Sequence, residues 1–154
     1  MKKILFLLLT TLTLLLAEEK TAKVVYDLTT EDMVQFERKV LKAIVVNKAH
    51  YEGQLRELDV VVVIHGEAYR FFTKDPLKTI YKTDKILLST HKTLAKRIES
   101  MIENYDVTFL MCGAGMEKRK LKKGDIYPFV TIIPNSTIGL IDQQNRGYAY
   151  IPVD

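Results

Sequence analysis

The chain has 154 residues, of which 47% are apolar and 27% are charged, and it contains one cysteine. That length fits one domain with a hydrophobic core of its own, and the composition excludes a disordered chain. A single cysteine excludes an intramolecular disulfide framework and any cysteine-rich zinc site.

The first residues have the pattern of an export signal. Two lysines precede an apolar run over residues 4–16 that stops at Ala17. A helix that crosses a bilayer needs about 20 apolar residues, so this run is too short for a span and matches the core of a secretory signal. We predict a signal peptide at residues 1–17 and one domain at residues 18–154. An uncleaved membrane anchor is the alternative.

The predicted signal peptide changes the net charge of the mature protein and indicates its location. The formal charge of the whole chain is +4, and it falls to +2 once the two lysines of the signal are removed. A nearly neutral, exported domain has no electrostatic reason to bind nucleic acid, so we predict no nucleic-acid partner. We expect an exported protein, periplasmic in a Gram-negative source, that meets the membrane only through its signal before cleavage.

The first half of the domain predicts a strand, a helix and a buried strand. Residues 23–28 are mostly apolar and β-branched, and residues 29–32 resemble a helix-starting capping box. Apolar residues then recur at helical spacing, which predicts a helix over residues 31–51. Residues 58–64 form an unbroken apolar run, which indicates a strand buried on both faces, as in a parallel sheet.

The second half continues this alternation. Residues 67–89 give little signal apart from Phe71 and Phe72, which we expect to cover the core. The remaining elements, in chain order, are a helix at residues 90–104, a strand at 107–111, a short basic helix at 116–123, a strand at 129–133, a helix after Asn135 and Ser136, and a strand at 148–151. Alternating strands and helices predict an α/β fold with a mainly parallel sheet.

Four strand-end junctions are where we expect chemistry, because ligands of parallel sheets bind beyond the carboxyl ends of the strands. They are residues 27–30, 65–67, 112–116 and 135–136. The first junction contains no glycine, although a nucleotide site needs the backbone to approach phosphate closely there. We therefore predict no cofactor, while the hydroxyls of this turn still suit a small anion.

Cys112 is the leading candidate for chemistry. It ends a predicted strand and precedes Gly113 and a helix start, where backbone N–H groups favour a thiolate. A cationic cluster at residues 118–123 follows it. Arg119 is seven positions away and Glu117 intervenes, which argues against an anion-cradling loop of the phosphatase or rhodanese type. The alternative is an inert, buried cysteine.

His65 is the one histidine at a predicted strand end. It is either a base beside the thiol or a polar group that hydrogen-bonds a neighbouring loop. His50 and His91 lie at no useful spacing from it, so we predict no metal site. Tyr150, close to the carboxyl terminus, is either a functional aromatic or part of a strand that caps the sheet or forms an oligomer contact.

Five segments of the chain together carry a family pattern. They are the strand ending in His65 and Gly66, the strand ending in Cys112 and Gly113, and residues 23–29, 130–134 and 140–151. In order and spacing they resemble the DsrE/DsrF-like family. The resemblance implies a three-layer α/β/α fold with a five-stranded parallel sheet and a tendency to form oligomers. It also implies that Cys112 accepts sulfur as a persulfide and passes it along a relay.

Two functions follow as hypotheses. In the first, the protein is an exported sulfur carrier or sulfurtransferase that works with a sulfur donor or acceptor protein. Its candidate residues are Cys112 and His65 for catalysis and, for binding, Gly66, Gly113, Ala114, Gly115, Met116, Asn135 and Ser136. In the second, the protein is a non-catalytic module that binds a small ligand or assembles as a homo-oligomer, and its cysteine is structural. A redox- or metal-responsive thiol shared between subunits is a third hypothesis.

Overall fold

One five-stranded sheet forms the centre of the molecule. The computed structural model describes residues 21–154, and the predicted signal peptide and its cleavage site lie outside them. The strands are β1 (Thr21–Leu28), β2 (Glu57–Ile64), β3 (Val107–Cys112), β4 (Thr131–Ile133) and β5 (Ala149–Val153). Their order is β4-β3-β2-β1-β5, and every neighbouring pair is parallel. The predicted α/β class with a parallel sheet is confirmed.

Strand β2 occupies the middle of the sheet, as its unbroken apolar run predicts. Val60 and residues 62–64 have no exposed surface, because neighbouring strands flank β2 and helices cover both of its faces. Burying one such side chain stabilises the fold by roughly 1.5–3 kcal/mol. Val60 pairs with Val24 of β1 and with Val107 of β3, and this register decides which residues meet at the carboxyl edge.

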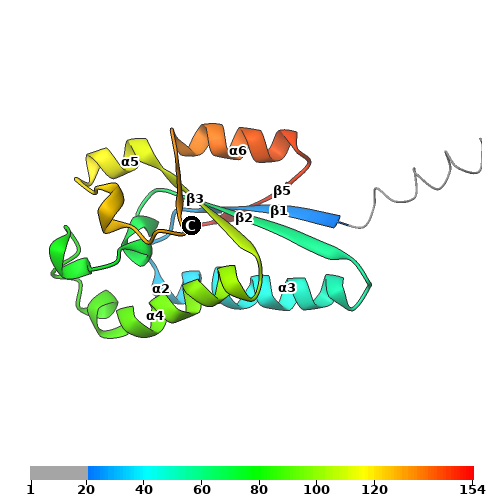
Figure 1. Ribbon diagram of the computed structural model, residues 1–154, viewed down its shortest axis with the longest axis horizontal. Helices are drawn as coiled ribbons and strands as arrows, with labels where there is room; N and C mark the ends of the chain where they lie inside the picture. The colour runs from blue at the N-terminus through cyan, green and yellow to red at the C-terminus, as the bar shows by residue number, and fades with distance from the viewer. Residues whose placement is uncertain (1–20) are drawn as a thin grey trace, which may run out of the picture.

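Helices cover both faces of the sheet (Figure 1). One face carries α2 (Met33–Phe36), α3 (Ala43–Glu52) and α4 (Lys85–Glu103), and the other carries α5 (Gly113–Lys118) and α6 (Ser136–Asn145). The larger core lies on the first side, where Phe72 packs against Phe36 and Phe109 with ring centroids 5.8 and 5.2 Å away. A smaller cluster beneath α6 contains Val25, Val61 and Val63. The expected three-layer arrangement is present.

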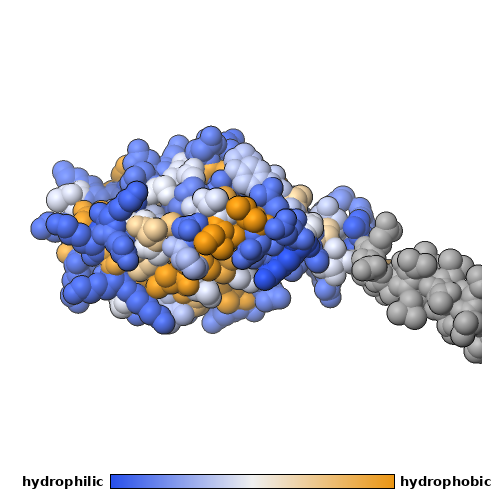
Figure 2. Space-filling view, turned by 90° about the horizontal axis from the view of Figure 1, so that it is seen from above, coloured by the Kyte–Doolittle hydropathy of each residue, from blue (hydrophilic) through white to orange (hydrophobic). Residues whose placement is uncertain are grey.

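The side that carries α5 and α6 exposes apolar surface (Figure 2). Apolar side chains gather across its middle, between hydrophilic ends. On α6, Ile138 and Ile141 expose 43% and 50% of their surface, and the edge strand β5 exposes Tyr150 and Ile151.

The helix predicted at residues 31–51 is present, with a different start. It consists of α2, a π-helical segment η1 (Glu37–Lys42) and α3. The Asp32 carboxylate caps it by accepting two N–H groups of the first turn. The capping box expected to start at Thr29 is therefore wrong. A carboxylate directly before the first turn reaches these donors, whereas the Thr29 hydroxyl donates to a carbonyl of β5.

Residues 67–84, which carry little sequence signal, form two short 3-10 helices. These are η2 (Ala68–Phe72) and η3 (Pro76–Lys78). Phe71 and Phe72 are fully buried, as expected. Helix α4 begins at Lys85, ahead of the predicted start at residue 90, because the Asp84 carboxylate accepts an N–H of its first turn.

The basic helix predicted at residues 116–123 is wrong. Helix α5 begins directly after β3 and ends at Lys118. It stops because Lys120 adopts a left-handed conformation with a φ of 55°, after which only a short 3-10 turn, η4 (Lys123–Asp125), forms. Helix α6 starts after Asn135, as expected. Within residues 21–154, no helix is long and apolar enough to cross a membrane.

Candidate functional site

Cys112 lies where β3 meets α5. It is the last residue of β3, pairs with Ile133 of β4 and is the N-cap residue of α5. Only 6% of its surface is exposed. The chain passes straight from strand to helix because Gly113 has no side chain: a Cβ there would lie 3.1 Å from the carbonyl oxygen of Ile133. Cys112 therefore ends its strand as the sequence predicts.

Hydrogen bonds around the Cys112 thiol favour its ionised form. Burial alone would raise the pKa of the thiol, but the Tyr69 hydroxyl, the backbone N–H of Gly115, and the backbone and side chain of Ser136 stabilise the thiolate. Together they hold the pKa of Cys112 below its ordinary value. Ser136 is the first residue of α6, so the positive end of that helix dipole also favours a negative sulfur.

Tyr69 connects the thiol to an ion pair. Its hydroxyl donates to the carbonyl oxygen of Cys112 at 2.7 Å. The guanidinium of Arg119 lies 4.8 Å from the centre of the Tyr69 ring and forms an ion pair of 2.5 Å with Glu67. Gly115 leaves the space that this arrangement needs, because a Cβ there would collide with the Tyr69 hydroxyl. Arg119 is therefore connected to Cys112 through the side chain of Tyr69, although the two residues are seven positions apart in the chain.

Asp27, His65 and Tyr150 form a second hydrogen-bonded group at this edge. His65 Nε2 lies 2.5 Å from one carboxylate oxygen of Asp27, and the Tyr150 hydroxyl donates to the other at 2.6 Å. Burial of Asp27 would raise its pKa, but the hydrogen bonds from His65 and Tyr150 and the charge of His65 hold that pKa below its ordinary value.

His65 and Cys112 lie at the ends of neighbouring strands. His65 directly follows β2 and Cys112 is the last residue of β3, and the residues before them, Ile64 and Met111, are paired. The His65 side chain is 27% exposed, and among residues 21–154 its ring is hydrogen-bonded to Asp27 and not to the thiol. The structure brings the two predicted catalytic residues to adjacent strand ends without joining them.

The other predicted binding residues take two kinds of position. Gly113, Ala114 and Met116 line an open hollow of about 520 Å³ beside β4. Asn135 instead caps α6, where its side chain accepts an N–H at 2.9 Å. Gly66 holds a φ of 61°, a left-handed conformation that lets the chain turn sharply after β2. These last two positions shape the turns around the site.

The remaining candidate positions are the turn after β1 and the histidines. The Thr29 hydroxyl donates to the Val153 carbonyl, and the Thr30 hydroxyl accepts the N–H of Asp32, so both are engaged within the protein. Over the part of the chain that the structure describes, no three His, Cys, Asp or Glu side chains gather as a metal site would require.

Two residues of the site, Tyr69 and Arg119, carry no sequence signal that would assign them to it. Tyr69 lies in the stretch with little signal, although its position four residues after His65 would place it within one helical turn of the strand end. Arg119 is too far along the chain to suggest contact with the thiol. It approaches because α5 directs the chain back over the Tyr69 ring.

The fold and the site define an α/β protein with a thiol of lowered pKa at the carboxyl edge of a parallel sheet. Residues 23–153 match the model of the DsrE/DsrF-like family, and the chain belongs to that family. A similar fold occurs in MTH1491 from Methanobacterium thermoautotrophicum, a protein of unknown function. The TM-score is 0.55 and the identity 18%, over 85% of this chain and 98% of that one.

A curated relative from Aquifex aeolicus (strain VF5), named "Uncharacterized protein", is 30% identical over 92 residues. The match covers 60% of this chain and 39% of that protein, so the chain spans well under half of its length.

Proposed function

We propose that the protein is a sulfur carrier in which Cys112 accepts a sulfur atom as a persulfide and passes it to an acceptor. The observation that carries this proposal is the set of hydrogen bonds from Tyr69, Gly115 and Ser136 that lowers the pKa of the thiol. The thiolate is the form that attacks sulfur, and a thiol of lower pKa is also the better leaving group. Family membership supports the same assignment.

The proposed reaction needs no external oxidant or reductant. The Cys112 thiolate attacks the terminal sulfur of an inorganic polysulfide or the outer sulfur of a persulfide. A new S–S bond forms as the S–S bond of the donor breaks, and the shortened donor leaves with the electron pair and takes up a proton. In the return step an acceptor thiolate attacks the outer sulfur, and Cys112 leaves as a thiolate.

His65 would act as the general acid and general base of this exchange. Asp27 fixes the ring through Nε2, so Nδ1 is the nitrogen left to give a proton to the departing donor or to take one from the acceptor. The Tyr150 hydroxyl donates a hydrogen bond to the other carboxylate oxygen of Asp27, and Tyr150 is a positioning residue in this scheme. The hollow that begins at Gly113 is the proposed approach of the donor, because it opens next to the residue that bears the thiol.

Intact-mass analysis tests the proposal. The reduced protein is exposed to inorganic polysulfide, measured, and measured again after addition of a small thiol acceptor. We expect mass increments of whole sulfur atoms that the acceptor removes. Cys112→Ala should carry none, because Cys112 is the only cysteine. A wild-type protein that gains no sulfur, or a variant that gains as much, would contradict the proposal.

A non-catalytic module with a structural cysteine is the second candidate, and the 6% exposure of Cys112 favours it. In that case a thiol-reactive dye should label the folded protein slowly. Cys112→Ser should also leave the mass of any oligomer unchanged. Rapid, stoichiometric labelling at neutral pH counts against this candidate and supports the carrier.

Export and self-association belong to the same proposal. The segment at residues 1–17 supports export, and the exposed Ile138, Ile141 and Ile151 support a contact between copies of the chain. The mature protein should begin at Glu18 and have a mass in solution larger than one chain. Retention of Met1 would refute cleavage, and a monomer at high concentration would refute self-association.

A further inference from the structure

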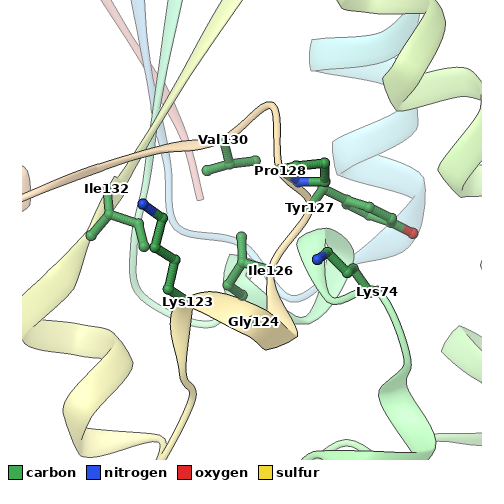
Figure 3. A pocket seen from close by; sticks show the side chains of 8 residues that line it. All are labelled: Lys74, Lys123, Gly124, Ile126, Tyr127, Pro128, Val130 and Ile132. Carbon is green, nitrogen blue, oxygen red and sulfur yellow. The ribbon is translucent and has the colours of Figure 1, made fainter.

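A second pocket, separate from the thiol, lies between the segment that follows η2 and the chain that leads from η4 into β4 (Figure 3). Its volume is about 250 Å³. Ile126, Val130 and Ile132 form apolar walls, and Tyr127 adds an aromatic ring. Of the residues that the structure describes, Ile132 alone lines both this pocket and the hollow beside Cys112.

Backbone pairing holds the walls of this pocket in place. Thr73 and Ile126 form an isolated antiparallel bridge. On either side of it, the N–H of Lys74 donates to the Asp125 carbonyl at 2.8 Å and the N–H of Tyr127 donates to the Phe72 carbonyl at 3.2 Å. The Tyr127 hydroxyl also lies 3.1 Å from Nε2 of His91 on α4. The pocket is therefore formed before any ligand arrives, which lowers the entropic cost of binding.

Two lysine side chains reach this pocket from opposite walls. Lys74 comes from the side of η2 and Lys123 from η4 (Figure 3), and among residues 21–154 no acidic side chain lines the space between them. Among residues 21–154, neither ammonium group forms an ion pair or donates a hydrogen bond. The nearby Asp125 carboxylate is already engaged by the N–H of Lys122. Residues 118–123, which contain no acidic side chain, add further positive charge.

These observations fit one kind of ligand. Two cations without partners favour a negative group, while the apolar walls favour a hydrocarbon or aromatic body. The volume is below the range of roughly 300–1,000 Å³ that holds drug-sized ligands, so the ligand is of metabolite size. We propose that this pocket binds a small organic anion, with a carboxylate or phosphate group between Lys74 and Lys123 and its body against Ile126 and Val130. The site is independent of the sulfur chemistry proposed for Cys112.

Titrations followed by amide NMR test the proposal with four probes: benzoate, phenyl phosphate, inorganic phosphate and the neutral benzamide. We expect benzoate or phenyl phosphate to shift the signals of Gly124 and Tyr127 with a Kd of about 1 mM. Whichever binds more tightly identifies the anionic group.

A double variant, Lys74→Met with Lys123→Met, removes both charges and keeps the apolar stems. It should bind about tenfold more weakly, since each exposed ion pair contributes a factor of roughly 1.5 to 5. The matched control, Lys92→Met with Lys96→Met on α4, makes the same change in net charge away from the pocket and should bind like the wild type.

Four outcomes would overturn the proposal. They are no shift with any probe, binding of benzamide as tight as that of the better organic anion, binding of inorganic phosphate as tight as that of the better organic anion, and equal loss in the double variant and its control. Amide spectra of both variants report whether the fold is intact, so a loss of binding through unfolding is recognised directly.

Discussion

Replacing Tyr69 with phenylalanine tests how the thiol acquires its lowered pKa. The substitution removes only the hydroxyl that donates to the Cys112 carbonyl and stabilises the thiolate. A hydrogen bond to a charged group contributes roughly 1.5–3 kcal/mol. The single proton of Tyr69 is shared between two acceptors, so the lower value applies here. One pKa unit corresponds to about 1.4 kcal/mol, and Tyr69→Phe should therefore raise the pKa of Cys112 by about one unit.

The pH dependence of alkylation by iodoacetamide measures this shift, because the thiolate alone reacts. Tyr81→Phe is the matched control, since the Tyr81 hydroxyl is buried and has no hydrogen-bond partner among residues 21–154. It should leave the inflection of the thiol unchanged and the protein no less stable. The reasoning fails if Tyr69→Phe leaves the inflection in place, or if both variants move it equally.

Three further substitutions, and one control, test the packing and charge around the site. Gly115→Ala forces a Cβ against the Tyr69 hydroxyl and should lower the free energy of unfolding in urea by about 1–3 kcal/mol, with a raised thiol pKa. Gly124→Ala, whose Cβ meets no atom of residues 21–154 within 4 Å, should stay within about 0.5 kcal/mol, and equal losses would contradict the packing argument. Gly66→Ala must adopt a φ of 61° and should lose at least about 1 kcal/mol in the same assay; an unchanged midpoint would contradict this. Because the folded pKa of Asp27 lies below its unfolded value, the ionised group stabilises the fold above about pH 4, and this contribution is lost as the pH falls through the folded pKa. Asp27→Asn should thus be less stable than the wild type at neutral pH, with a gap that closes in acid and not one that is constant with pH.

The fold follows from the sequence where burial alone determines the element. The apolar run of β2 specifies a strand covered on both faces, and the alternation of elements specifies parallel pairing. Helix α5 could not be placed in the same way. Its start depends on the close approach of Gly113 to the Ile133 carbonyl, and its end depends on the left-handed Lys120. Both are tertiary features with no periodic pattern in the chain.

The site likewise has residues that the sequence predicts and residues that only tertiary contacts bring in. The ends of parallel strands meet at one edge, so Cys112 and His65 can be assigned to the same edge of the sheet from strand predictions alone. The hydrogen-bond partners of these two residues cannot be assigned from the strand predictions. Tyr69 reaches the thiol through an irregular 3-10 segment, and Asp27 meets Tyr150 only because β5 pairs with β1 from the far end of the chain.

The chemical state of Cys112 in the protein taken from its natural source tests the carrier role most directly. Thiols and persulfides are alkylated as the cells are opened, and the peptide that contains Cys112 is analysed by mass spectrometry. The account predicts a fraction of this peptide with one additional sulfur between the cysteine sulfur and the alkyl group. Recovery of the peptide solely as the alkylated thiol or as a disulfide, while a polysulfide-loaded standard keeps its extra sulfur through the same procedure, would contradict it.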